Sequence, residues 1–304
     1  MTYDADRSSP APSTAMTRVC PLLERETPTT VLDIAPAPWV VRACRETGFV
    51  FLENPPGYES LRADIAWEVS WAREAERRAA AEPVLHALGE VAKRVRSPKR
   101  NKVADLTTTI VRRLDAPRID LLDVGCGEGT LLGVVMDRLP EAVRRRCVPQ
   151  GIEISDELAR RSQAALAAHG GRCVHASALE GLAVFPADSV DLIVLASFLE
   201  HEIQPLPLLR ECSRILRPGG RVVVKVPNHA SWNRHVRGRR WCGYRWPDHV
   251  NYFTPRTLAA AARRAGLDVA RMNWLDRLPV SDSLYAVLET GLRPDGAGAP
   301  SRDA

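Results

Sequence analysis

The chain has no run of about 18 or more apolar residues, so no membrane-spanning helix is expected. Residues 1–17 are polar and rich in proline, serine and alanine, and they lack the apolar stretch of a secretory signal peptide. We expect residues 1–17 and 291–304 to be disordered tails. No internal repeat is visible.

The chain also lacks paired cysteines. Its seven cysteines are scattered, and none stands in a C-x-x-C pair. Because the number is odd and no export signal precedes them, we expect reduced thiols and a cytoplasmic location. The net charge of +5 is too small by itself to imply a nucleic-acid partner.

From residue 119 onward, short apolar runs alternate with amphipathic stretches. This pattern predicts an α/β fold with a Rossmann-like, doubly wound and mostly parallel sheet of seven strands. We expect strands at 119–123, 147–154, 172–175, 190–196, 221–226, 268–274 and 283–288, and helices at 130–139, 155–168, 206–216 and 254–266.

The first part of the chain has a different pattern. Short apolar runs at 30–34, 39–42 and 48–52, broken by proline and glycine, predict a small β unit over residues 18–57. Helical periodicity then predicts a connector over residues 58–117, and the main α/β domain is expected at 118–290.

The most informative stretch is residues 121–130, Leu-Leu-Asp-Val-Gly-Cys-Gly-Glu-Gly-Thr. A buried strand ends at Asp123, and glycines follow at positions 125, 127 and 129. Glycine permits a tight turn and lets backbone amides approach a ligand closely. A dinucleotide fingerprint needs its third small residue at position 130, where Thr130 stands, so the turn is not that of an NAD site.

Three more segments occur downstream at characteristic spacing: residues 151–155 around Glu153, residues 190–201 ending in Leu-Glu-His, and residues 214–222 containing Arg-Pro-Gly-Gly. In this order, the four segments resemble those of class I S-adenosylmethionine-dependent methyltransferases. The resemblance covers residues 119–288 and is closest to the broad group of small-molecule and quinone-biosynthesis-type enzymes. It implies S-adenosylmethionine as the methyl donor.

The resemblance also implies which residues hold this cofactor. Glu153 would accept hydrogen bonds from the ribose hydroxyls, as an acidic residue does in dinucleotide folds. Ser177 stands where the family usually has an aspartate that contacts the adenine amine, so that contact would be uncharged. The expected cofactor-binding residues are Asp123, Gly125, Cys126, Gly127, Gly129, Glu153, Ile154, Ser177, Ala178 and Ser197.

Methyl transfer needs a general base only when the acceptor must lose a proton. The candidates for this role are His201, just after the fourth expected strand, and the pair Asp248 and His249. In the resembled family, a histidine at the position of His201 is often a packing or pocket-wall residue, and His249 can be a wall of the acceptor site instead of the base. No metal is expected.

The segment 231–253 interleaves tryptophan and tyrosine with arginine. We interpret it as a lid over the substrate; a purely structural loop is the alternative. Binding of nucleic acid by stacking and charge is a further possibility.

Residues 18–57 resemble a zinc ribbon that is often fused ahead of such methyltransferases, with Cys20 and Cys44 at its two knuckles. Leu23 and Thr47 occupy the positions of the second cysteine of each pair. A structural zinc site needs four nitrogen or sulfur ligands, so we expect a ribbon-like unit without metal.

The resulting prediction is an enzyme that transfers the methyl group of S-adenosylmethionine to oxygen, nitrogen or carbon of a small or medium-sized acceptor. No membrane partner is expected. Two alternatives stay open: a non-catalytic cofactor-binding descendant, and an RNA methyltransferase that uses the arginine and tryptophan residues of segment 231–253.

Overall fold

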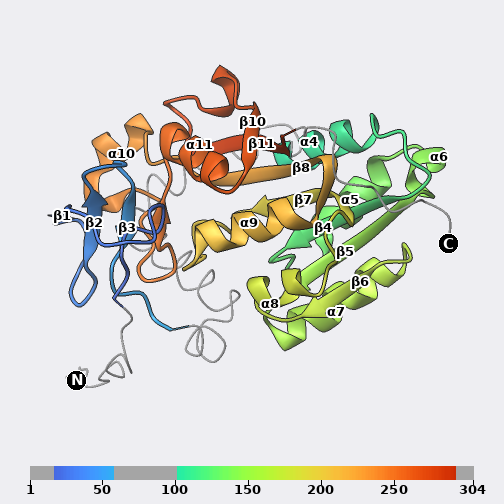
Figure 1. Cartoon of the computed structure of the whole chain (residues 1–304), viewed down its shortest axis with the longest axis horizontal. Helices are drawn as coiled ribbons and strands as arrows, with labels where there is room; N and C mark the ends of the chain where they lie inside the picture. The colour runs from blue at the N-terminus through green and yellow to red at the C-terminus, as the bar shows by residue number, and fades with distance from the viewer. Residues whose placement is uncertain (1–16, 58–100, 292–304) are drawn as a thin grey trace, which may run out of the picture.

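The computed structural model describes residues 17–57 and 101–291. They form a large sheet covered by helices and a smaller sheet beside it (Figure 1). The predicted tails, apart from residues 17 and 291, and most of the predicted connector, residues 58–100, lie outside the described residues. Within the described ranges, no helix is long and apolar enough to cross a membrane.

The large sheet has seven strands in the order β10-β11-β8-β7-β4-β5-β6. The pairs among β4 to β8 are parallel, whereas β11 runs antiparallel to β8 and β10 antiparallel to β11. This confirms the predicted mostly parallel seven-stranded sheet. The strands are β4 (Ile119–Val124), β5 (Cys147–Glu153), β6 (Arg172–His175), β7 (Val190–Ala196), β8 (Leu216–Pro227), β10 (Leu267–Arg271) and β11 (Ser283–Thr290).

Helices cover both faces of this sheet, because neighbouring strand residues point to opposite sides. Leu121 belongs to one apolar cluster with residues of α4, α5 and α7, whereas Leu122 belongs to another with residues of α8, α9 and α11. The α-helices are α4 (Lys102–Val111), α5 (Thr130–Arg138), α6 (Glu141–Arg144), α7 (Asp156–Ala167), α8 (Ala178–Ala183), α9 (Pro205–Ile215), α10 (Trp232–Arg237) and α11 (Pro255–Arg264). Residues of α4 belong to the same apolar cluster as Leu121 of β4. The predicted domain boundary at residue 118 therefore lies between members of this one cluster.

The direction of strand addition reverses at β4. From β4 the chain passes to β5 and β6 on one side, and then returns to β7 and β8 on the other. In open α/β sheets a ligand binds beyond the carboxyl ends of the strands at such a switch point. The fold therefore directs attention to the residues that follow β4, β5 and β7.

The smaller sheet joins parts of the chain that are far apart in sequence. Strands β1 (Thr29–Leu32), β2 (Val41–Cys44) and β3 (Val50–Leu52) form an antiparallel meander, and β9 (Asn251–Tyr252) pairs with β3. In Figure 1 these N-terminal strands, in blue, lie beside α10 of segment 231–253.

The aromatic residues of segment 231–253 mostly pack against the smaller sheet. Trp241, Tyr244 and Tyr252 are buried in one apolar cluster with Val41 and Leu52. Trp232, on α10, is by contrast 61 % exposed. This segment is thus part of the core of the N-terminal unit, and a role as a substrate lid stays a prediction.

Candidate functional site

A cavity of about 510 Å³ lies beyond the carboxyl ends of β4, β5 and β7. The side chains around it come from the loops that follow these strands and from the first turns of α5, α7 and α8. Its lining includes Asp123, Gly125, Cys126, Gly127, Glu153, Ile154, Ser177, Ala178 and Ser197, and also Phe198, His201 and Glu202. Nine of the ten predicted cofactor residues therefore come together; Gly129 is not part of the lining.

The glycine turn after β4 has the backbone conformation that its sequence predicts. Gly125, Gly127 and Gly129 all have φ between +56° and +76°, which L side chains rarely adopt. At Gly125 a Cβ atom would clash with the ring of Phe198, whereas at Gly127 it would meet open space. Gly129 is instead the N-cap residue of α5 and packs against Ser162 of α7.

Two buried carboxyl groups face this cavity. Glu153, at the end of β5, is 7 % exposed, and its two oxygens accept hydrogen bonds from the backbone amides of Gly127 and Ser155, each at 2.9 Å. Asp123 is 3 % exposed, and burial, together with the nearby charge of Glu153, raises its pKa to about 8. A cationic or hydroxylated ligand would stabilise these buried carboxyl groups by supplying hydrogen-bond donors.

The raised pKa of Asp123 predicts how stability depends on pH. In the unfolded chain this group ionises near pH 4, so between about pH 4 and 8 the native state binds more protons. The contribution of Asp123 to stability is therefore complete below pH 4 and is lost as the pH rises to 8. We expect Asp123→Asn to stabilise the protein at pH 8 by on the order of 1 to 3 kcal/mol, and much less at pH 5.

Urea unfolding of both proteins at pH 5 and pH 8 measures this difference. Asp137→Asn, on the exposed side of α5, is the matched control and should leave the pH profile unchanged. A gain from Asp123→Asn that is equal at the two pH values would refute the assignment.

The remaining predicted cofactor residues are held by local contacts. The Ser177 hydroxyl donates to Glu180 at 2.5 Å, so it is engaged at the start of α8. Ser197 adopts φ +58°, a strained value for a residue with a side chain, and its hydroxyl accepts from Lys225 of β8. The Cys126 thiol lies 3.1 Å from the Ser162 hydroxyl.

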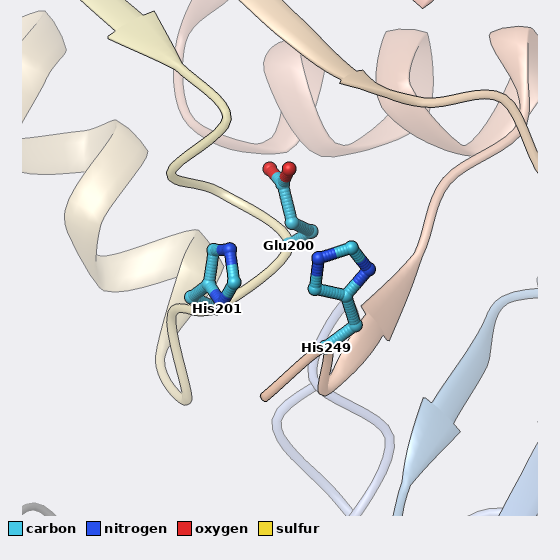
Figure 2. Close-up of side chains that lie close together, drawn as sticks. All are labelled: Glu200, His201 and His249. Atoms are coloured by element: carbon cyan, nitrogen blue, oxygen red, sulfur yellow. The ribbon is translucent and has the colours of Figure 1, made fainter. Parts of the chain in front are cut away.

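The two histidines proposed as bases lie next to each other (Figure 2). Their ring centroids are 4.7 Å apart and the rings are nearly perpendicular. His201 lines the cavity, whereas His249 is buried behind it. Burial lowers the pKa of His201 to about 3 and that of His249 well below its ordinary value. Both imidazoles are thus neutral at pH 7 and are weak proton acceptors.

Figure 2 shows a third side chain, Glu200, near these rings, with its carboxylate above them. One ligand atom from each of Glu200, His201 and His249 lies within 4.8 Å of the others. Burial raises the pKa of Glu200 to about 7. The sequence motifs identify the two histidines separately, but no motif indicates that both lie close to Glu200.

Two residues that position this region were not predicted. Arg18 is 8 % exposed and donates to Asn251 Oδ1 at 2.9 Å and to the Ile203 carbonyl oxygen at 2.7 Å. The Asn251 side-chain amide in turn donates to the carbonyl oxygens of Leu199 and Glu202, on either side of Glu200 and His201. A buried arginine next to a β strand leaves no periodic signal in a sequence.

Comparisons with known proteins agree with this fold. Residues 94–271, more than half of the chain, match a family model described as a methyltransferase domain. The ubiquinone biosynthesis O-methyltransferase of Cupriavidus pinatubonensis is 30 % identical over 168 residues, covering 53 % of this chain and 65 % of that protein. The corresponding enzyme of Nitrosospira multiformis is 27 % identical over 169 residues, covering 53 % and 68 %. The match to the first relative thus spans less than two thirds of its length.

Solved structures give more distant matches. The complex between the Haloferax volcanii Trm112 methyltransferase activator and a methyltransferase contains a chain with a TM-score of 0.48 and 19 % identity, covering 63 % of this chain and 90 % of that one. The CurJ carbon methyltransferase has a TM-score of 0.47 and 17 % identity, covering 63 % and 56 %. Because residues 94–271 match this family model, the chain belongs to the methyltransferase domain family.

Proposed function

We propose that this protein transfers the methyl group of S-adenosylmethionine to an oxygen atom of a small hydroxylated acceptor. The observation that carries the proposal is the cavity at the switch point, into which a glycine turn and two buried carboxyl groups converge. The choice of oxygen follows the two relatives, whose names describe O-methyltransferases.

The residues of the cavity fit this cofactor. Asp123 and Glu153 are buried acceptors suited to ammonium and hydroxyl groups, and Gly127 has space on its cavity side. Ile154, Leu158 and Phe198 add apolar surface suited to a purine ring. When bound, S-adenosylmethionine supplies a methyl group on a positively charged sulfur. The chain itself has to orient the acceptor and keep water out.

The arginine residues of segment 231–253 offer little support for an RNA substrate. Arg239 is paired with Asp33, Arg245 with Asp248, and Arg234 donates to the His229 carbonyl oxygen. Three of the basic groups that would meet a phosphate backbone are therefore already engaged within the chain.

Calorimetry with S-adenosylhomocysteine and a transfer assay with isotope-labelled S-adenosylmethionine test the proposal. We expect one molecule of S-adenosylhomocysteine per chain, and transfer of label to hydroxyl groups in a panel of catechols and phenols. Amines and RNA serve as comparison acceptors. Failure to bind S-adenosylhomocysteine would overturn the proposed cofactor, and binding without transfer to any acceptor would favour a non-catalytic descendant.

A further inference from the structure

We propose that Glu200, His201 and His249 form a binding site for one divalent transition-metal ion, with Zn²⁺ as the best-suited ion, at the edge of the cofactor cavity. The cysteine pattern predicts no metal. These three side chains, however, come from the loop after β7 and from the loop before β9, so only the folded chain brings them together.

The first observation is that both histidines are oriented as metal ligands are. His201 Nδ1 lies 2.8 Å from the Asp248 carbonyl oxygen, and His249 Nδ1 lies 2.8 Å from the Gly243 carbonyl oxygen. A carbonyl oxygen only accepts hydrogen bonds, so each Nδ1 carries the proton and each Nε2 keeps its lone pair. A backbone carbonyl behind a ligating histidine is the usual way in which a protein fixes this tautomer.

The second observation concerns Glu200. Its side chain is 1 % exposed, and within the described part of the chain its Oε2 atom has no hydrogen-bond partner. A buried carboxylate oxygen without a donor is costly, and a cation next to it would remove that cost. In Figure 2 the Glu200 side chain starts next to the two imidazole rings, and its carboxylate lies above them.

The dimensions of the cluster suit a metal ion after a small contraction. Two ligand atoms of one tetrahedral Zn²⁺ ion lie about 3.4 Å apart, since each bond is about 2.1 Å long. The three ligand atoms lie within 4.8 Å of one another. Side-chain rotations that move these atoms by on the order of 1 Å would complete the coordination.

The donor set selects the class of metal. Two imidazole nitrogens and one carboxylate favour Zn²⁺ and related transition-metal ions over Mg²⁺, which prefers oxygen ligands. Three protein ligands leave a coordination position open. Because His201 also lines the cavity, this position can take an acceptor oxygen, whose pKa the metal would lower. This catalytic use, unlike the site itself, rests on the proposed function.

The test uses the full-length protein, stripped of metal with a chelator and titrated with ZnCl₂ by calorimetry. We expect one equivalent of Zn²⁺ to bind, and Glu200→Gln and His249→Gln each to weaken binding at least about tenfold. The matched control is His229→Gln, a buried histidine outside the cluster whose Nε2 lies 3.1 Å from the Tyr244 hydroxyl, and it should bind as the wild type does. MgCl₂ should give no measurable binding.

Cobalt spectra of the wild type keep the proposal testable even if a variant fails to fold. Co²⁺ should show ligand-field bands without a thiolate-to-cobalt charge-transfer band, and Cys20→Ser should leave them unchanged. The proposal is overturned by absence of stoichiometric binding, by thiolate bands, or by equal affinity of the wild type and Glu200→Gln. S-adenosylhomocysteine binding, measured on the same samples, reports on the proposed function separately.

Discussion

Replacing Arg18 with methionine should lower the free energy of unfolding by about 3 to 5 kcal/mol. The guanidinium group is buried and donates to three backbone carbonyl oxygens, those of Leu52, Ile203 and Val250, and to the side chain of Asn251. Methionine fills most of the volume but removes the Arg18 donor from the Leu52 and Ile203 carbonyl oxygens and from Asn251 Oδ1 in a region closed to water. The Val250 carbonyl oxygen keeps the Leu52 backbone amide as a donor, at 2.9 Å. Each unsatisfied buried acceptor costs about 1 to 3 kcal/mol, and partial relaxation reduces the sum.

Urea unfolding followed by tryptophan fluorescence and by circular dichroism measures this loss. Arg25→Met is the matched control, because Arg25 pairs with Glu46 at 2.7 Å on the surface, where both side chains are more than 40 % exposed. A pair of this kind contributes at most about 1 kcal/mol. If the two variants lost the same free energy, Arg18 would not be the buried link between the N-terminal unit and the loop after β7.

Gly127→Arg should abolish binding of S-adenosylhomocysteine, with an affinity loss of at least about a hundredfold, which corresponds to about 2.7 kcal/mol. Gly127 lines the cavity, and its amide donates to Glu153 at 2.9 Å. A Cβ at this position meets no atom within 4 Å, so we expect an arginine side chain here to extend beside the cavity and to exclude the ligand from it. The backbone strain at φ +56° adds a stability cost of about 1 to 2 kcal/mol.

The control for this strain is Gly170→Arg. Gly170 follows α7 with φ +72°, also meets open space, and does not line the cavity. Calorimetry with both variants should show normal binding for Gly170→Arg despite a similar loss in urea unfolding. Equal binding by both variants, weak or strong, would show that the cavity is not where the ligand binds.

The large sheet could be predicted almost strand by strand. The strand at 190–196 is observed with the predicted ends, and that at 147–154 ends one residue earlier than expected. Strands buried on both faces are continuous apolar runs, so local sequence determines them. The exception is β8, which was expected to begin at residue 221 but begins at Leu216 and includes Pro218, Gly219 and Gly220. The order of four motifs then supplied the family, which the match over residues 94–271 confirms.

The smaller sheet was only half predictable, for a physical reason. The runs at 30–34, 39–42 and 48–52 correspond to β1, β2 and β3, with ends that shift by up to two residues. Strand β9 has only two residues, which is too short for any alternation of polar and apolar positions. Without β9, the aromatic residues of segment 231–253 look like a lid, although Trp241 and Tyr252 are among the largest fully buried side chains of the described protein.

The candidate site also contains a part that the sequence predicts and a part that it does not. The predicted cofactor residues follow neighbouring strands of one sheet, so the topology brings them together and their motifs can be recognised in the sequence. The meeting of His201 with His249 depends instead on where segment 231–253 docks. The backbone amides of Val250 and Asn251 both donate to the Glu200 carbonyl oxygen, at 2.8 and 3.1 Å, and no sequence pattern encodes this contact.

The pairing of β3 with β9 also bears on the order in which the protein forms. Val50 pairs with Tyr252, so the contact closes a loop of about 200 residues, and such non-local contacts form slowly because their entropic cost comes first. The large sheet with its cofactor cavity can assemble from contacts that are much closer in sequence. The N-terminal unit thus leaves the ribosome before the large sheet but is completed after it, and the Glu200, His201 and His249 cluster forms only when β9 pairs with β3.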